Sequence, residues 1–184
     1  MELNDEDKGG SINQVELSQD GENIIKVFWN TEINDMSEMF DSCDNIISVD
    51  MTHFDISSVT SMNCMFSGCT TLVWADFSNL EANSLTDVSS MFAGCTSLIS
   101  LDLSNFRAPS IKKMFLMFQQ CSSLTSINLS GFDTSSVTDM MSLFEECQQL
   151  IYLDLSNFNT TLVEETFHMF YRINSLKILN LKNA

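Results

Sequence analysis

One unit of about 26 residues repeats from near residue 31 to the end of the chain, and this periodicity limits the possible folds more than any other feature. A fixed period of about 20–50 residues is the signature of a stacked array in which each copy packs on its neighbours. Three columns of the unit keep a constant phase: Phe40, Phe66, Phe92, Phe118, Phe144 and Phe170; Cys43, Cys69, Cys95, Cys121 and Cys147; and Ile46, Leu72, Leu98, Leu124, Leu150 and Leu176.

The first half of each unit has the apolar spacing of an amphipathic helix. Apolar residues at i, i+3, i+6 and i+7 would form one stripe on a helix, as they do at Val59, Met62, Met65 and Phe66. A hydroxyl residue followed three positions later by an acidic residue is typical of a helix start. We therefore predict a helix of about two to three turns that ends near the cysteine of each unit. The start signals are Ser84 with Asp87, Ser136 with Asp139, and Thr161 with Glu164.

The second half of each unit reads L-x-x-L-D-L-S-N-F, which alternates apolar and polar residues as a half-buried strand does. In Leu101-Asp102-Leu103 the leucines would point inward and the aspartate outward. Strands that are each followed by a helix return to the same end and must be parallel. We predict an α/β repeat array with short helices on one face and six parallel strands on the other, in a sheet about 25–30 Å across.

Composition divides the chain into three parts. Residues 1–12 are acidic and polar, which predicts a disordered tail. Residues 13–30 predict a β-hairpin that turns at Asp20-Gly21 and caps the end of the array. Residues 31–184 hold about six copies of the unit, the last of them incomplete.

The chain has a formal net charge of −17 at pH 7, and 18 of its 25 carboxylates lie in the first 106 residues. Such a charge repels nucleic-acid phosphates and anionic membrane surfaces, and no apolar run is long enough to span a bilayer. We therefore expect neither nucleic-acid binding nor membrane insertion. A solvated surface that maintains solubility explains the charge, and a docking surface for a basic partner is the alternative.

The full pattern, L-x-x-L-D-L-S-N-F followed by V-T-x-M-x-x-M-F-x-x-C, resembles the 26-residue subclass of BspA-like leucine-rich repeats over about residues 31–184. The resemblance implies a leucine-rich-repeat solenoid of surface or secreted proteins of bacteria and protists, often linked to adhesion and without enzymatic activity. No signal peptide is visible at the N-terminus, so a cytoplasmic location is the alternative to the cell surface. The matching segments are Met39–Phe66, Met65–Phe92, Met91–Phe118, Met117–Phe144 and Leu143–Phe170.

The outward strand positions form the candidate binding surface. One column is a row of aspartates interrupted by Asn128 and Asn180, and the column beside it holds the two exposed aromatic candidates. Tyrosine and tryptophan dominate contact hot spots, whereas a flat carboxylate row offers too few ligands for Ca²⁺. A solvated face whose carboxylates bond the adjoining turn is the alternative. The predicted partner-binding residues are Trp74, Tyr152, Asp50, Asp76, Asp102 and Asp154.

We predict that the six cysteines stay reduced. Five of them share one column with parallel side chains, which suits small buried hydrophobes better than disulfides, and Cys64 lies off that column as the most exposed thiol. No C-x-x-C pair occurs, and His53 and His168 fall in distant copies, so we predict no metal site. Phosphate-binding, nucleophile-elbow and H-E-x-x-H motifs are lacking, so we predict no catalytic residue, no cofactor and no enzymatic activity.

These features favour a non-catalytic protein-interaction or adhesion module that binds a protein or glycan ligand through the strand face of the array. The alternative is an architectural subunit of a larger intracellular assembly, which the acidic tail and the lack of a visible signal favour.

Overall fold

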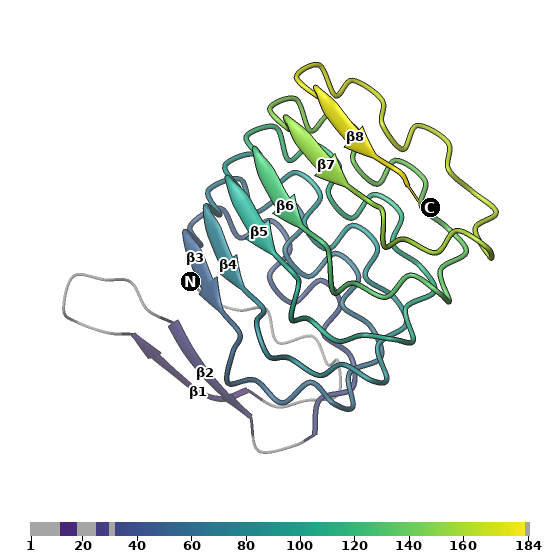
Figure 1. Ribbon diagram of the computed structural model, residues 1–184. Helices are drawn as coiled ribbons and strands as arrows, with labels where there is room; N and C mark the ends of the chain where they lie inside the picture. The colour runs from purple at the N-terminus through teal and green to yellow at the C-terminus, as the bar shows by residue number, and fades with distance from the viewer. Residues whose placement is uncertain (1–11, 18–24, 30–31, 183–184) are drawn as a thin grey trace.

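The computed structural model describes residues 12–17, 25–29 and 32–182. Strands β1 (Ile12–Leu17) and β2 (Ile25–Trp29) pair antiparallel, with Leu17 opposite Ile25 (Figure 1). The turn predicted at Asp20-Gly21 lies outside the described residues, as does the predicted tail apart from its last residue. The role of this strand pair as a cap remains a prediction.

Six strands of three residues each follow, and they lie side by side in the same direction (Figure 1). They pair parallel as β3 with β4, β5 with β6, and β7 with β8, so the single six-stranded sheet that we predicted is wrong. Between β4 and β5 the ladder is reduced to a bond from the Ile99 N–H to the Val73 carbonyl oxygen, at 3.3 Å. The strands are β3 (Ser48–Asp50), β4 (Trp74–Asp76), β5 (Ser100–Asp102), β6 (Ser126–Asn128), β7 (Tyr152–Asp154) and β8 (Ile178–Asn180).

The predicted helices are wrong, because the described residues contain no helix. An α-helix requires each N–H to bond the carbonyl four residues earlier. Here the Met65 N–H donates to the Met62 carbonyl three residues earlier (3.2 Å), and the next N–H, that of Phe66, donates to the Met91 carbonyl of the following coil (2.9 Å). The chain is therefore a stack of coils built from short strands and turns, and the α/β fold class is corrected accordingly.

Residues in the left-handed region recur four apart in every coil and fix these turns. In the second coil they are Cys64, with a φ of 55°, and Gly68, with a φ of 67°. A right-handed helix cannot contain such residues. The predicted helix-start acids also serve a different purpose, since Asp87 Oδ1 accepts the Ser89 N–H at 3.0 Å and fastens a turn. The equivalents of Cys64 and Gly68 in the later coils are Ser90, Leu116, Ser142 and His168, and Gly94, Gln120, Glu146 and Arg172.

Replacing Gly94 with alanine tests the left-handed turn at this position. Gly94 has a φ of 72°, and an added Cβ would meet nothing closer than the Gly68 Cα at 3.5 Å. Because the left-handed conformation costs a residue with a side chain about 1–2 kcal/mol, we expect a similar loss in the free energy of unfolding. Urea denaturation measures the sign, and a stabilised variant would contradict the observed turn.

The core is a column of phenylalanine rings that runs through the whole stack. Phe66, Phe92, Phe118 and Phe144 are completely buried. Neighbouring rings stack with centroids 5.4–6.3 Å apart and planes within 14° of parallel. Such offset contacts add to the stabilisation that burial alone provides. The repeat therefore buries its largest apolar groups only between coils, as an array requires.

The cysteine column lies beside the rings, and all six cysteines are free thiols. Each of the four buried thiols donates to the carbonyl oxygen of a phenylalanine in the preceding coil, as Cys95 does to Phe66 at 3.2 Å. Burial raises the pKa of the Cys69 and Cys147 thiols to about 12 and raises those of Cys95 and Cys121 as well. This column is therefore a structural one.

Thiol labelling is expected to separate the cysteines into two groups. Cys43 and Cys64 are partly exposed, whereas the other four are buried and held as thiols. Because the thiolate is the reactive form, iodoacetamide should modify only Cys43 and Cys64 in the folded protein and all six after unfolding in urea. Mass spectrometry of the two samples counts the modified sites. Rapid modification of Cys95 or Cys121 without denaturant would contradict the packed column.

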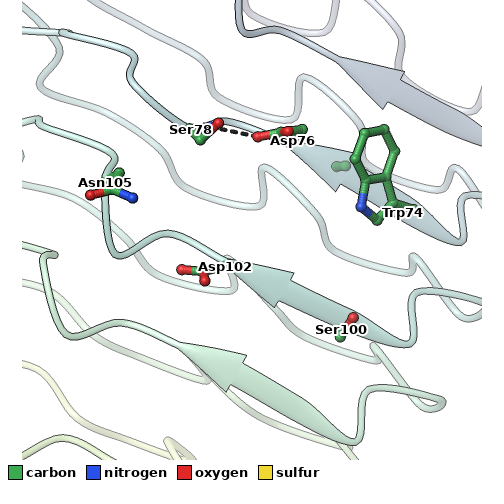
Figure 2. A pocket seen from close by; sticks show the side chains of 7 residues that line it. Trp74, Asp76, Ser78, Ser100, Asp102 and Asn105 are labelled. Atoms are coloured by element: carbon green, nitrogen blue, oxygen red, sulfur yellow. Dashed lines mark hydrogen bonds between the residues drawn. The ribbon is translucent and has the colours of Figure 1, made fainter.

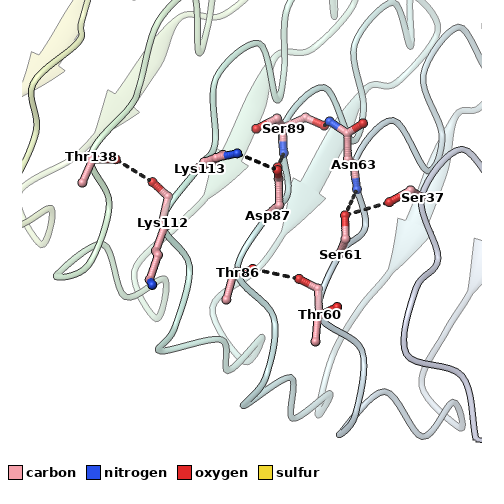
Figure 3. Close-up of polar contacts among 10 residues, drawn as sticks. All are labelled: Ser37, Thr60, Ser61, Asn63, Thr86, Asp87, Ser89, Lys112, Lys113 and Thr138. Atoms are coloured by element: carbon pink, nitrogen blue, oxygen red, sulfur yellow. Dashed lines mark hydrogen bonds and ion pairs between the residues drawn. The ribbon is translucent and has the colours of Figure 1, made fainter.

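The side of each coil half a repeat away from the strands is joined by polar contacts (Figure 3). The N–H and the hydroxyl of Thr86 both donate to the Thr60 carbonyl, at 2.9 and 3.1 Å. Lys113 Nζ lies 3.7 Å from Asp87 Oδ2 of the preceding coil. This side therefore uses its polar groups to hold coils together.

Among the described residues there is no helix long and apolar enough to cross a bilayer.

Candidate functional site

The outward positions of the six parallel strands form one continuous surface, called the strand face below. The first position of every strand is exposed, with Trp74 46% and Tyr152 47% accessible. The middle position points inward, and Leu101 is 3% accessible. The last position holds the aspartate or asparagine. The structure thus brings the six predicted contact residues onto one face, in two adjacent rows.

The carboxylates of this face fasten the turn that follows each strand. Asp76 Oδ1 accepts the N–H of Ser78, two residues further on, at 2.8 Å. Asp50, Asp102 and Asp154 make the same bond at 2.8–3.0 Å, and Asn128 and Asn180 make it at 3.2 Å. The fold therefore needs one oxygen acceptor at this position and does not need the negative charge. The turn does not need the second carboxylate oxygen either, which leaves it available for other contacts.

Hydrogen bonds keep several of these carboxylates ionised in acid. The hydroxyl and N–H of Thr52 lower the pKa of Asp50, and those of Ser104 lower the pKa of Asp102. The pKa of Asp154 falls to about 2, because Ser156 donates twice and the Tyr152 hydroxyl donates as well. These three carboxylates consequently keep their negative charge below the ordinary pKa of a carboxyl group.

A depression of about 270 Å³ lies on the strand face at β4 and β5 (Figure 2). The indole of Trp74 stands at its rim, and Asp76 and Asp102 approach it from adjacent coils. Within the described residues, the second carboxylate oxygen of Asp76 has no donor. The depression is lined by Trp74, Ala75, Asp76, Ser78, Ser100, Asp102 and Asn105.

The second aromatic side chain of the strand face is engaged differently. The Tyr152 hydroxyl donates to Asp154 Oδ2 at 2.9 Å. Asp154 therefore uses both carboxylate oxygens within its own coil. The sequence predicted Trp74 and Tyr152 as equivalent contact residues, whereas the structure leaves an acceptor free beside Trp74 alone.

Basic side chains of the described residues make their ion pairs away from the strand rows. Lys113 pairs with Asp87, and Arg172 Nη1 lies 2.7 Å from Glu146 Oε1. Neither pair involves a residue of the parallel strands. In the same part of the chain, no three His, Cys, Asp or Glu side chains gather where a metal ion would bind.

Sequence reasoning missed a second surface, at the last coil. An apolar depression of about 630 Å³ is lined there by residues that include Phe158, Met169 and Phe170, and Phe167 is 64% accessible. The signal was present, because Tyr171 occupies a column that is Gln119 and Glu145 in earlier coils. The apolar surface of the last described coil was not predicted.

Comparisons with known proteins place the chain in a family. A family model described as "Mycoplasma protein of unknown function, DUF285" matches residues 13–127 and residues 86–183. No curated protein and no solved structure matches the chain. The two family matches overlap within the repeats and together extend from the antiparallel strands to the last coil. The chain belongs to the DUF285 family, a family of repeat-containing proteins.

Proposed function

We propose that the chain is a non-catalytic interaction module that binds a partner through its strand face. The observation that carries the proposal is the depression at Trp74, where an exposed indole adjoins a carboxylate oxygen without a donor among the described residues. Exposed tryptophans at the centre of a surface are frequent contact hot spots. The stacked coils present this surface on a rigid scaffold, which lowers the entropy lost on binding.

The resemblance to BspA-like leucine-rich repeats supports adhesion as the biological setting. The resemblance rests on the recurring L-x-x-L-D-L-S-N-F segments. From it we propose a location at the cell surface or in the secreted fraction, and a protein or a glycan as the ligand. The net charge of −17 argues against nucleic acid as that ligand. The proposal assigns no catalytic residue and no cofactor.

A capture experiment with matched variants tests this proposal. Purified chain is immobilised and exposed to extract from the organism of origin and from its host or growth surface. The test variant is Trp74→Ala combined with Tyr152→Ala, and the control is Lys112→Ala, an exposed side chain on the opposite side of the coil. A ligand that the control retains and the test variant loses supports the proposal. Equal retention by both variants would refute it, provided that circular dichroism shows both to be folded.

An architectural subunit is the second candidate, and the apolar end of the last coil favours it. The exposed hydrophobic side chains there are of the kind that a stable subunit contact covers, and they include Leu162, Phe167, Tyr171 and Leu181. This candidate predicts that Phe167→Ser abolishes co-purification with a fixed partner, whereas Trp74→Ala does not. The adhesion proposal predicts the reverse.

A further inference from the structure

We infer that the Trp74 depression receives an arginine side chain from a basic segment of the partner protein. The inference rests on the proposed function and adds the chemistry of the contact. A guanidinium group needs a carboxylate that it can approach with two N–H donors and an aromatic face on which it can lie. The depression offers both features, with Trp74 at its rim and Asp76 beside it (Figure 2).

The charge of the site is not neutralised by the chain itself. Asp76 accepts one N–H, from Ser78, and its other oxygen has no donor among the described residues. Asp102, on the adjacent coil, adds a second negative charge at the same depression. Both carboxylates line the depression, so a cation that enters it is attracted by two negative charges from adjacent coils. A guanidinium placed there would form charge-assisted hydrogen bonds.

Charge complementarity extends beyond the depression. The described coils before Arg107 contain carboxylates and no lysine or arginine, because Lys8 and Lys26 are the only lysine or arginine residues of the first 106 and both precede the coils. The ion pairs of Lys113 and Arg172 lie off the strand rows. The first three parallel strands thus present a surface of negative charge, which favours a basic protein segment over a neutral glycan.

The surroundings of Tyr152 explain why the Trp74 depression, and not the second aromatic residue of the strand face, is the preferred site. There the Tyr152 hydroxyl and the Ser156 N–H already occupy both oxygens of Asp154. A guanidinium would have to displace one of these donors. The pair of Tyr152 and Asp154 is therefore a matched internal control on the same face.

Asparagine replacements remove the charge and keep the fold. Asn128 and Asn180 already hold the same column and accept the same backbone N–H at 3.2 Å. Asp76→Asn is therefore the test variant and Asp154→Asn its matched control. All proteins in this experiment are the full chain and also carry Trp29→Phe. Trp74 is then the single tryptophan, and its fluorescence alone reports on the site. Circular dichroism confirms that each variant folds.

The probes are a short arginine-containing peptide and the same peptide with citrulline, its neutral analogue, in place of arginine. We expect the arginine peptide to change Trp74 fluorescence saturably, with affinity that falls as salt is added, and the citrulline peptide to have no effect. Asp76→Asn should weaken binding by roughly tenfold or more, which corresponds to the loss of one charge-assisted contact, and Asp154→Asn should leave it unchanged.

Three results would overturn the inference: equal binding of the citrulline peptide, no loss with Asp76→Asn, or no response to the arginine peptide. A saturable response to neutral oligosaccharides without one to arginine would replace it with a glycan site. In each of these cases the proposed function still stands if capture of a partner depends on Trp74. Capture that does not depend on Trp74 would refute the proposed function, whatever the peptide result.

Discussion

Replacing Phe92 with alanine is expected to lower the free energy of unfolding by about 3–5 kcal/mol. The ring is completely buried, and its centroid lies 5.8 Å from that of Phe66 and 6.0 Å from that of Phe118. It also packs nearly perpendicular to the ring of Phe77, with ring centroids 5.6 Å apart. Removing it leaves a cavity between coils and breaks contacts to both neighbours. Chemical denaturation monitored by circular dichroism measures the loss.

The matched control is Phe170→Ala in the last coil. Phe170 belongs to the same column but is only partly buried, and it stacks on a single ring of the column, that of Phe144 at 6.3 Å. Because it has one neighbouring coil within the described array, we expect a clearly smaller loss than for Phe92. Equal losses at the two positions would contradict a stack in which each coil depends on both of its neighbours.

Replacing Ser90 with proline is expected to be nearly as damaging, by about 3 kcal/mol or more. Ser90 has a φ of 55°, which the proline ring cannot adopt because it fixes φ near −65°. The change also removes the N–H that donates to the Phe115 carbonyl of the next coil, at 2.9 Å. Both effects act on the turns that replace the predicted helix. The midpoint of urea unfolding should therefore fall sharply.

Asn83→Pro provides the control for this variant. The equivalent position of the next coil is Pro109, and an alanine precedes both positions, at Ala82 and Ala108. The coil geometry therefore already accepts a proline there. We expect Asn83→Pro to change the free energy of unfolding by less than about 1 kcal/mol, in either direction. If Asn83→Pro were as damaging as Ser90→Pro, the equivalence of successive coils would be wrong.

The repeat and its strands were predictable from the sequence, whereas the other half of each coil was not. The column spacing located every parallel strand, because alternation in segments such as Leu101-Asp102-Leu103 has a period of two. Residues buried at Val59, Met62 and Met65 form an apolar stripe on a helix. The same spacing also suits a chain that turns inward at every third residue, and periodicity alone does not separate the two.

Glycine gave a partial signal of these turns. Gly68 and Gly94 fall on one column, each directly before the cysteine near which we predicted the helix to end. Glycine favours the left-handed conformation, which also ends many helices, and both residues have a positive φ. Helices of about two to three turns are also marginal without strong packing. In later coils the same column holds residues with side chains, such as Gln120 and Glu146, which also have a positive φ. These residues concealed the glycine signal in the sequence.

The candidate site was predictable as a surface but not in its detail. Strand alternation placed Trp74 and Asp76 on the outward side, where the structure has them. The bonds that distinguish Asp76 from Asp154 depend on side-chain orientation across two residues, which sequence spacing does not encode. The two aromatic residues therefore looked alike in the sequence and differ in the structure.

Site-specific photo-crosslinking tests the central claim, that the strand face is the docking surface, most directly. Benzoylphenylalanine is introduced at Ser100, an exposed strand-face position beside the Trp74 depression, or at Lys112, an exposed position on the opposite side. Both proteins are irradiated with a captured ligand or with an extract that contains it. We expect a cross-linked product from position 100 and none from position 112. A product from position 112 alone would contradict the claim and move the docking surface to the opposite side of the coils.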